Sequence, residues 1–401
     1  MSGPLSGVRV VEVASVIAGP LASMWLADQG ADVIKIEPVN GGDTTRALAS
    51  QPELGGMAGL FVNANRGKRS VTVDLGVPEG RDLVLDLCRE ADVFLQNWRP
   101  GAMERAGLDY AAVSAVAPEI VYVSVSGFGP DGPYAHRRAY DPIVQGLTGY
   151  VAVQRNPEIP FPDLVRTLVA DKATALVVAQ AVVAALFVRE RGQGGQHIEV
   201  PMLDSALAFL FPDAYMARSL LDDPKREVRP TIAQTFRVAT TSDGQVITHT
   251  GNLGQMHGLF RALGHPEWAE DPRFATPTEI RRNFEVLGPM LAAAFEESVT
   301  ADLSVALEAE DVPFAPVAGL DDVADDPQVR HNGALSVRTV APVGRVLEVA
   351  HPARFSGTPV QLAPPAPLLG QHTDEVLAEL GRTGDEIQAL RRTAVIGPKH
   401  D

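Results

Sequence analysis

The sequence predicts an α/β protein whose main domain is a doubly wound parallel sheet, accompanied by a second and smaller α+β domain. Three observations predict it. Strands rich in β-branched residues alternate with helical segments in the N-terminal half, the 401-residue chain is too long for one ordinary core, and the character of the sequence changes after Leu221. Ligands of such sheets bind at the carboxyl ends of the strands, so we expect the functional residues in the loops that follow them.

The strands and helices of the sheet can be placed from hydrophobic periodicity and from helix boundary residues. A helix is expected over 20–29, where Gly30 ends it, another over 78–91, opened by Pro78, and a long one over about 172–191. Strands are expected over 8–13, 31–37, 70–75, 92–97, 120–129 and 197–203.

The domain boundaries follow from polar and Pro-containing stretches. Residues 1–220 are expected to form the N-terminal part of the large domain, and the polar stretch 222–235 reads as a linker. Residues 225–325 mix short strands such as VITHT with helices such as VLGPMLAAAFEE, which indicates the small domain. Residues 330–401 contain Pro-rich loops and a final helix.

Composition excludes several classes of function. The chain has 34 basic and 50 acidic residues and a net charge of −16, which argues against a nucleic-acid partner, although a local cluster of arginines can still hold an anion. Its nine histidines form no metal-binding pattern, and HExxH, paired CxxC, Walker A, GxSxG and GxGxxG motifs are missing. We therefore expect no metal, ATP or dinucleotide cofactor. The single cysteine, Cys88, reads as a buried inert thiol in a helix.

The sequence also predicts a cytoplasmic protein with no membrane partner. The N-terminus lacks the basic and apolar regions of a signal peptide. The longest apolar run, 175–188, is too short to span a bilayer, contains Gln180, and is expected to form a buried helix.

Seven stretches in a fixed order resemble the family III CoA-transferases, the group that includes formyl-CoA:oxalate CoA-transferase and carnitine CoA-transferase. They are PLSGVRVVEV with AGP, LADQGADVIKIEP, GGDTTR, NRGKRSVTVDL, ADVFLQNWRPGAMERAGL, SVSGFGPDGPYAHRRAYD and DKATALVVAQAVVAALFVRERGQGGQHIEV. The match is dense from about residue 4 to 205. The resemblance implies an enzyme that acts on acyl-CoA and carboxylic acids. It also implies a Rossmann-like large domain to which 330–401 returns, and two subunits interlocked as an obligate homodimer.

Asp171, in the segment LVADKATAL, carries the predicted chemistry. From the residues alone, an aspartate at the start of a long helix is most simply its N-cap. The resemblance instead implies that Asp171 is the nucleophile, which forms a mixed anhydride with the acyl group and then an aspartyl-CoA thioester. The two roles are compatible, because a helix N-terminus also favours the ionised carboxylate.

The resemblance further implies a CoA-binding site in the loops after the strands. Arg105 and Arg138 are suited to phosphate oxygens, and Trp98 to the adenine ring. Pro38 stands where relatives often carry a basic residue. A mobile loop over the active site is expected around Gly251 and Gly254, where a plain strand-to-helix turn is the alternative. The implied CoA contacts are Ile17, Ala18, Val73, Asp74, Leu75, Gly76, Asn97, Trp98, Arg99, Arg105, Arg138 and Tyr140.

Two alternatives share the same fold. An α-methylacyl-CoA racemase deprotonates the α-carbon with a histidine that precedes an aspartate, but here Tyr140 occupies that position, and tyrosine is a poor base at neutral pH. His136 lies four positions too early. A non-catalytic CoA-binding protein is the second alternative, because a fold does not fix a function. The intact Asp171 argues against it.

Overall fold

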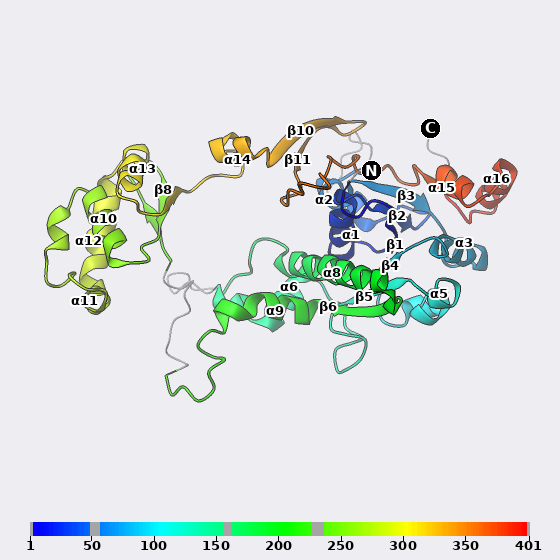
Figure 1. The fold of residues 1–401 in the computed structure, drawn as a ribbon, viewed down its shortest axis with the longest axis horizontal. Helices are drawn as coiled ribbons and strands as arrows, with labels where there is room; N and C mark the ends of the chain where they lie inside the picture. Colours follow the sequence, from blue (N-terminus) through cyan, green and yellow to red (C-terminus); the bar gives the residue numbers. More distant parts are fainter. Residues whose placement is uncertain (1–2, 49–56, 155–161, 226–235, 399–401) are drawn as a thin grey trace. The chain divides into compact units, whose positions relative to one another are not determined.

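The computed structural model describes residues 3–48, 57–154, 162–225 and 236–398, and the chain divides into two compact units (Figure 1). The first unit comprises Met1–Pro212 together with His331–Asp401, and the second comprises Asp213–Arg330. Most of the predicted linker over 222–235 lies outside the described residues.

A six-stranded sheet with the order β3-β2-β1-β4-β5-β6 forms the centre of the first unit, and every neighbouring pair is parallel. This confirms the expected α/β class. The chain leaves β1 in one direction along the sheet and later returns to build the other half from β4, so the order reverses between these two strands. A crevice opens at the carboxyl ends of two strands where the order reverses. The strands are β1 Arg9–Val13, β2 Asp32–Glu37, β3 Lys68–Thr72, β4 Val93–Gln96, β5 Val121–Ser126 and β6 Gln196–Pro201.

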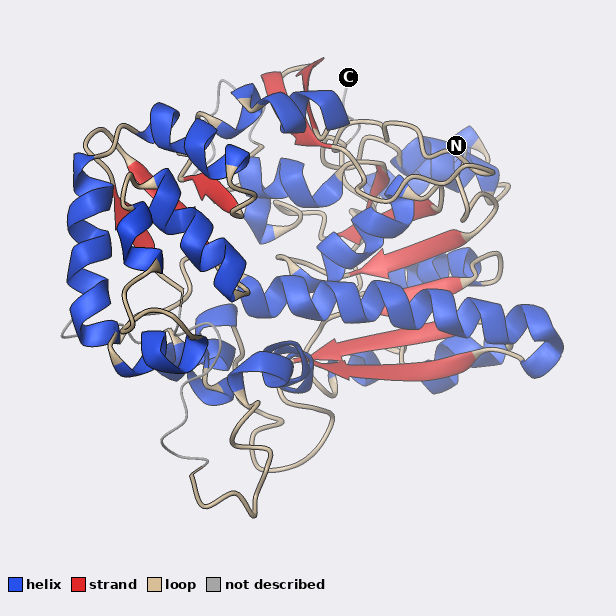
Figure 2. Cartoon of the chain, turned by 60° about the vertical axis from the view of Figure 1, so that its left-hand side comes forward, coloured by secondary structure: helices blue, strands red, loops and turns tan. Residues whose placement is uncertain are grey.

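Helices cover both faces of this sheet. On one face α1 packs against α8, which also contacts β5 and β6, and Figure 2 shows the long helix α8 lying along the strands. On the other face, α3, α4 and α5 enclose an apolar core with side chains of β1, β2 and β4. The helices that follow the strands of this unit are α1 Ala18–Asp28, α2 Gly59–Asn65, α3 Pro78–Cys88, α4 Ala102–Ala106, α5 Tyr110–Val116, α6 Asp141–Thr148, α7 Tyr150–Val153, α8 Val169–Val188 and α9 Met202–Ala214, with a 3-10 turn η1 at Thr44–Arg46 and a π-helical turn η3 at Arg189–Gln193.

The boundary residues act locally as expected. Pro78 is the first residue of α3, where its missing N–H costs no hydrogen bond. Gly30 follows α1 at a φ of 101°, a conformation that glycine adopts without strain. Cys88 ends α3 fully buried, and burial raises the pKa of its thiol, which agrees with the predicted inert role.

Helix α8 differs from the expected buried helix. It begins at Val169, and the segment Val169–Gln193 is the only helix in the described ranges that is long and apolar enough to cross a membrane. One side of α8 packs on the sheet, whereas Leu176, Val183 and Phe187 on the other side are 50%, 41% and 60% exposed. The prediction of a buried helix therefore holds for the side of α8 that packs on the sheet and is wrong for the opposite side. A helix that is apolar all round gives no sequence signal that separates the two sides.

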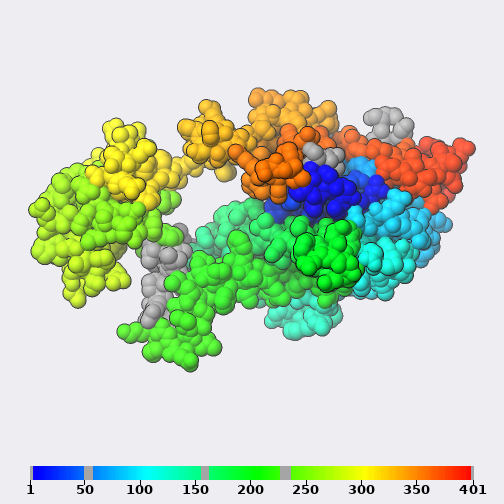
Figure 3. Space-filling view, in the orientation of Figure 1, coloured from blue at the N-terminus to red at the C-terminus, as the bar shows by residue number. Residues whose placement is uncertain are grey.

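The C-terminal segment packs against the edge strand β3. Figure 3 shows the orange and red residues of this segment lying against the blue residues of the N-terminal part. The backbone N–H of His372 donates to the Ser70 carbonyl at 2.9 Å, and that of Asp74 donates to the Val395 carbonyl at 2.8 Å. These bonds attach the C-terminal segment to β3 and to the loop that follows it. The segment contains α14 Pro327–Asn332, which begins in the second unit, the hairpin of β10 Leu335–Val340 and β11 Gly344–Val349, α15 Thr373–Glu379 and α16 Gly384–Arg392.

The second unit has its own core of helices packed on a small antiparallel sheet with the order β7-β8-β9. The expected strand at VITHT and the expected helix at VLGPMLAAAFEE both form. Its elements are β7 Val238–Thr240, β8 Gln245–Thr248, α10 Leu253–Ala262, η5 Pro266–Ala269, α11 Pro277–Arg282, α12 Phe284–Glu297, α13 Thr300–Ala309, β9 Phe314–Pro316 and η6 Val323–Asp325.

Candidate active site

Asp171 is the third residue of α8, and its side chain does not cap the helix. A different carboxylate takes that role. The backbone N–H groups of Ala170 and Asp171 donate to Oδ2 of Asp141 at 2.7 and 3.1 Å, so the cap comes from the start of α6. The local expectation of an N-cap at Asp171 is wrong, because a tertiary contact satisfies the free N–H groups of this helix end.

Asp141 is itself held firmly. It is 3% exposed, and its Oδ1 accepts a hydrogen bond of 2.6 Å from Nε2 of Gln145, one turn along α6. Oε1 of Gln145 accepts the backbone N–H of Val165 at 2.9 Å, in the segment that leads into α8. This chain of bonds fixes the first turn of α8 and with it the backbone of Asp171.

The carboxylate of Asp171 is 8% exposed and stands in an environment that resists its ionisation. Burial, and to a smaller extent the negative charge of Asp141, together raise the pKa of Asp171 to about 7, while a hydrogen bond from the backbone N–H of Ala18 acts in the opposite direction. The expected effect of the helix N-terminus in favour of the ionised carboxylate is therefore outweighed by burial and by Asp141. With a pKa of about 7, both the protonated and the ionised forms of Asp171 are populated near neutral pH.

A cavity of about 440 Å³ opens beside Asp171 at the carboxyl ends of β1 and β4. The loop Ser15–Ala18 after β1 and the loop Asn97–Arg99 after β4 form two of its walls, so the cavity lies where the strand order reverses. It brings together nine of the predicted site residues, namely Ile17, Ala18, Asn97, Trp98, Arg99, Arg105, Arg138, Tyr140 and Asp171.

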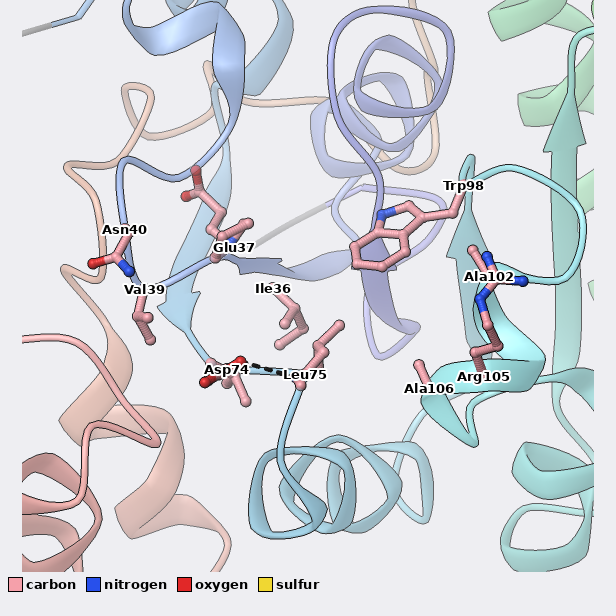
Figure 4. Close-up of a pocket in the computed structure, with 13 residues that line it drawn as sticks. Ile36, Glu37, Val39, Asn40, Asp74, Leu75, Trp98, Ala102, Arg105 and Ala106 are labelled. Atoms are coloured by element: carbon pink, nitrogen blue, oxygen red, sulfur yellow. Dashed lines mark hydrogen bonds between the residues drawn. The ribbon is translucent and has the colours of Figure 1, made fainter. Parts of the chain in front are cut away.

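A second cavity of about 440 Å³ lies along the carboxyl ends of β2 and β3 (Figure 4). It is lined by the predicted residues Val73, Asp74, Leu75 and Gly76, and by Pro38, whose missing basic side chain is the departure noted above. Trp98, Ala102 and Arg105 line both cavities, so a single wall runs from one to the other. Figure 4 shows two members of this shared wall, the ring of Trp98 and the side chain of Arg105, which projects from α4.

Four arginines line the Asp171 cavity, and none of them forms an ion pair with any residue in the described ranges. Three are Arg99, Arg105 and Arg138, which the sequence had singled out. The fourth, Arg137, had not been considered. Its guanidinium lies 3.8 Å from the centre of the Tyr134 ring, a cation–π contact that holds the side chain in place. A group of unpaired guanidinium groups in a protein of net charge −16 marks a site for anions.

The side chain of Asn97 is occupied by the protein itself. Its Oδ1 accepts the backbone N–H of Ser15 at 2.9 Å, and its Nδ2 donates to the Ser15 carbonyl at 2.7 Å. Asn97 therefore joins the two loops that bound the cavity.

The predicted glycine-containing loop belongs to the second unit. Gly251 lies in the turn between β8 and α10, and Gly254 is the second residue of α10. Oε1 of Gln255 accepts the backbone N–H of Gly251 at 2.8 Å, a local contact at the start of that helix.

The position of Tyr140 bears on the racemase alternative. Tyr140 lines the Asp171 cavity and is 57% exposed, whereas His136 is not among the described residues that line it.

The described part of the chain holds no cluster of three or more histidine, cysteine or acidic side chains that could bind a metal ion.

The fold and this site define a CoA-transferase: the chain belongs to CoA-transferase family III, whose model matches residues 5–373. Succinate–glutarate CoA-transferase of Agrobacterium fabrum is 37% identical, covering 98% of this chain and 97% of the relative. Human succinyl-CoA:glutarate CoA-transferase is 30% identical over 99% of this chain and 91% of its own. A CAIB/BAIF family protein from Brucella suis has a crystal structure that matches with a TM-score of 0.83 and 36% identity, over 95% of this chain and all (100%) of the other.

Proposed function

We propose that this enzyme transfers CoA between dicarboxylic acids through covalent intermediates on Asp171. The observation that carries the proposal is a buried carboxylate at the head of a cavity that is lined by unpaired arginines. A carboxylate is a suitable nucleophile for this reaction because both of its adducts, the anhydride and the thioester, remain reactive enough to pass the group on.

The proposed reaction begins when an Asp171 oxygen attacks the carbonyl carbon of the acyl-CoA thioester. The C–S bond breaks, CoA leaves as a thiolate, and a mixed anhydride forms. The thiolate then attacks the aspartyl carbonyl, which releases the first acid as a carboxylate and leaves an aspartyl-CoA thioester. The acceptor carboxylate reverses both steps.

The backbone N–H of Ala18 has a defined part in this scheme. It donates to the Asp171 carboxylate, and in the second step the negative charge of the tetrahedral intermediate develops on the same group. A fixed donor at that place stabilises the oxyanion without reorganisation. The raised pKa of Asp171 has a second consequence, since a carboxylate that is poorly solvated and basic is a stronger nucleophile than a solvated one.

The two cavities suit the two halves of an acyl-CoA. We assign the cavity along β2 and β3 to the nucleotide, with the Trp98 ring against the adenine, and the Asp171 cavity to the thioester end. Arg105 lines both and is placed for phosphate oxygens between them, and we assign Arg138 to the same task.

The substrate class is proposed from two observations. Relatives that match nearly the whole chain are named as enzymes of succinate and glutarate, which are dicarboxylic acids. Arg137 lines the Asp171 cavity and is held against Tyr134, so we assign it to the second carboxylate of such an acid.

A donor and acceptor assay tests the proposed function. With succinyl-CoA as donor, we expect transfer to glutarate and little transfer to butyrate, which lacks the distal carboxylate. Arg137→Ala should raise KM for glutarate about 10- to 100-fold, because it removes one charge-assisted contact. Arg105→Ala is the matched control and should raise KM for succinyl-CoA instead. Equal use of butyrate and glutarate by the wild type would contradict the dicarboxylate assignment, and no CoA transfer at all would contradict the function.

We also propose that the enzyme is an obligate homodimer that works in the cytoplasm, where the single cysteine stays reduced. The exposed apolar side chains on three helices support the dimer, because exposed apolar surface is typical of protein–protein interaction sites. The side chains are Ile143 and Leu147 on α6, Leu176, Val183 and Phe187 on α8, and Phe209 on α9.

A charged residue on this face is expected to prevent assembly. Phe187→Glu should give unfolded or aggregated protein rather than a folded monomer, because the interface of an obligate dimer contributes to folding itself. Leu320→Glu in the second unit is the control, since Leu320 is 97% exposed, and it should sediment as the wild-type dimer. Sedimentation of the wild type as a folded monomer at nanomolar concentration would show that the dimer is not obligate.

A further inference from the structure

The loop between β1 and α1 is strained and lines the same cavity as Asp171. Val16 has a φ of 70°, in the left-handed region that β-branched residues rarely adopt. Such a conformation costs on the order of 1–3 kcal/mol and persists only where the surroundings impose it. Two residues later, Ala18 begins helix α1, which packs against α8, and lines the same cavity as Asp171. A hydrogen bond from its backbone N–H lowers the pKa of the Asp171 carboxyl.

Two side chains from different elements hold this loop, one at Ser15 and the other at the strained residue Val16 itself. Asn97, after β4, bonds both the N–H and the carbonyl of Ser15. Asp43, before η1, accepts the N–H of Val16 on its Oδ1 at 3.3 Å. The same oxygen accepts the N–H of Thr45 at 2.9 Å, which fixes the direction of the Asp43 carboxylate.

Asp43 is anchored in a buried charge network under the sheet. Its Oδ2 lies 3.0 Å from Nζ of Lys35, which is also 2.8 Å from Oε1 of Glu12. The second oxygen of Glu12 lies 2.8 Å from Nζ of Lys68. All four side chains are essentially inaccessible to water, so the position of Asp43 is set by ion pairs that cannot exchange with solvent.

We propose that Asp43 and Asn97 are positioning residues for the transferase reaction, which hold the strained turn at Val16 so that the N–H of Ala18 is aimed at Asp171. This inference rests on the proposed function. In this proposal Asn97 holds the loop and does not contact CoA. The buried charge network fixes Asp43 and, through Asp43, the turn at Val16.

The charged and titratable groups near Asp171 can be named, so a change in the pKa of Asp171 can be attributed either to one of them or to the loop. Asp141 lies on α6, and the other groups line the cavity. They are Arg99, Arg105, Arg137, Arg138 and Tyr140. None of them contacts Asp43 or Asn97 through a hydrogen bond or ion pair in the described residues, so substitutions of these two act on Asp171 through the loop.

The test reads the pKa of Asp171 in two independent ways. The first is the acid limb of kcat/KM against pH. The second is the difference in unfolding free energy between each variant and the same variant carrying Asp171→Asn, followed against pH, which needs no substrate. Asn97→Ala and Asp43→Ala should each shift both readings upward by about one pH unit, because a hydrogen bond to the charged form is lost. They should lower kcat about tenfold at pH 7 and leave KM for acyl-CoA unchanged.

Three further variants separate positioning from a general structural effect. Asp43→Asn loses the ion pair with Lys35 and turns an N–H donor toward either Lys35 or Val16, so it should shift both readings in the same direction as Asp43→Ala. Asp28→Asn breaks the buried ion pair with Arg66 at the far end of α1. It should lower the unfolding free energy without shifting either reading of the Asp171 pKa. Val16→Gly removes the strain, so Asn97→Ala should cause a smaller loss of kcat in that background than alone.

The proposal is overturned if Asn97→Ala raises KM for acyl-CoA with no shift in the titration, which would make Asn97 a ligand contact. It is also overturned if Asp28→Asn shifts both readings as far as the positioning variants do. Failure of the proposed function is a separate result, namely wild-type enzyme without CoA transfer, and the unfolding measurement still decides the role of the loop in that case.

Discussion

Replacing Asp171 by alanine is expected to abolish CoA transfer, with a fall in kcat on the order of 10⁴-fold or more, because no covalent intermediate can form. Wild-type enzyme incubated with succinyl-CoA alone should accumulate an aspartyl-CoA thioester. Hydroxylamine should convert this adduct to a hydroxamate on Asp171, and intact mass and peptide mapping would locate it. The alanine variant should show neither species.

Asp171→Glu is the informative control for this result. It keeps a carboxylate but displaces it by one methylene, and a misplacement of about 1 Å typically costs on the order of 100-fold. We therefore expect slow transfer with a detectable adduct on residue 171. Transfer by Asp171→Ala at the wild-type rate would mean that the carboxylate is not the nucleophile and that acyl transfer proceeds directly between substrates.

Much of the fold could be predicted because the strands of a parallel sheet are buried on both faces. The strand expected over 8–13 appears as β1, and the one over 31–37 as β2, with shifts of one residue at their ends. The charges within these strands were harder to interpret. Glu12 and Lys35 become partners only through the register that pairs them across β1 and β2, and sequence alone does not give that register.

The surface of α8 shows a second feature that the sequence alone does not predict, namely which side of the helix is buried. Apolar residues surround this helix, and such a pattern looks the same whether the partner is the rest of the chain or another subunit. The sequence predicted burial, yet Phe187 is exposed in the single chain. Only the packed structure separates the side of α8 that the sheet covers from the side that stays exposed in this chain.

In the site, residues recognised by resemblance come together at the expected edge of the sheet, but their electrostatics could not be anticipated. Local pattern made Asp171 a helix cap, whereas Asp141, which comes 30 positions earlier, supplies the cap and also repels the charge on Asp171. Arg137 was missed because a second arginine beside Arg138 carries no local signal. Its contact with Tyr134 depends on how that loop folds.

Asp171→Asn is expected to stabilise the protein at alkaline pH while it removes activity. The pKa of Asp171 is about 7 in the native state and near 4 in the unfolded chain. Between these values the unfolded state has lost the proton that the native state keeps, so wild-type stability falls as pH rises from 4 to 7 and then stays level. Asparagine resembles the protonated form and avoids this loss. The gain in unfolding free energy should reach on the order of 2–4 kcal/mol at pH 8 and be about a third of that at pH 5.

Chemical denaturation at pH 5 and pH 8 measures this gain in unfolding free energy. Asp141→Asn is the control, because it makes the same aspartate-to-asparagine change at a neighbouring buried position. The Asp141 carboxylate accepts three hydrogen bonds, from Ala170, Asp171 and Gln145, so its loss should destabilise the protein at pH 8. If Asp141→Asn lowers the unfolding free energy and Asp171→Asn raises it, the Asp141 carboxylate stabilises the fold and the Asp171 carboxylate destabilises it. If Asp171→Asn were no more stable than wild type at pH 8, or if its gain were equal at pH 5 and pH 8, the carboxylate would not be under the electrostatic stress that its burial and Asp141 impose.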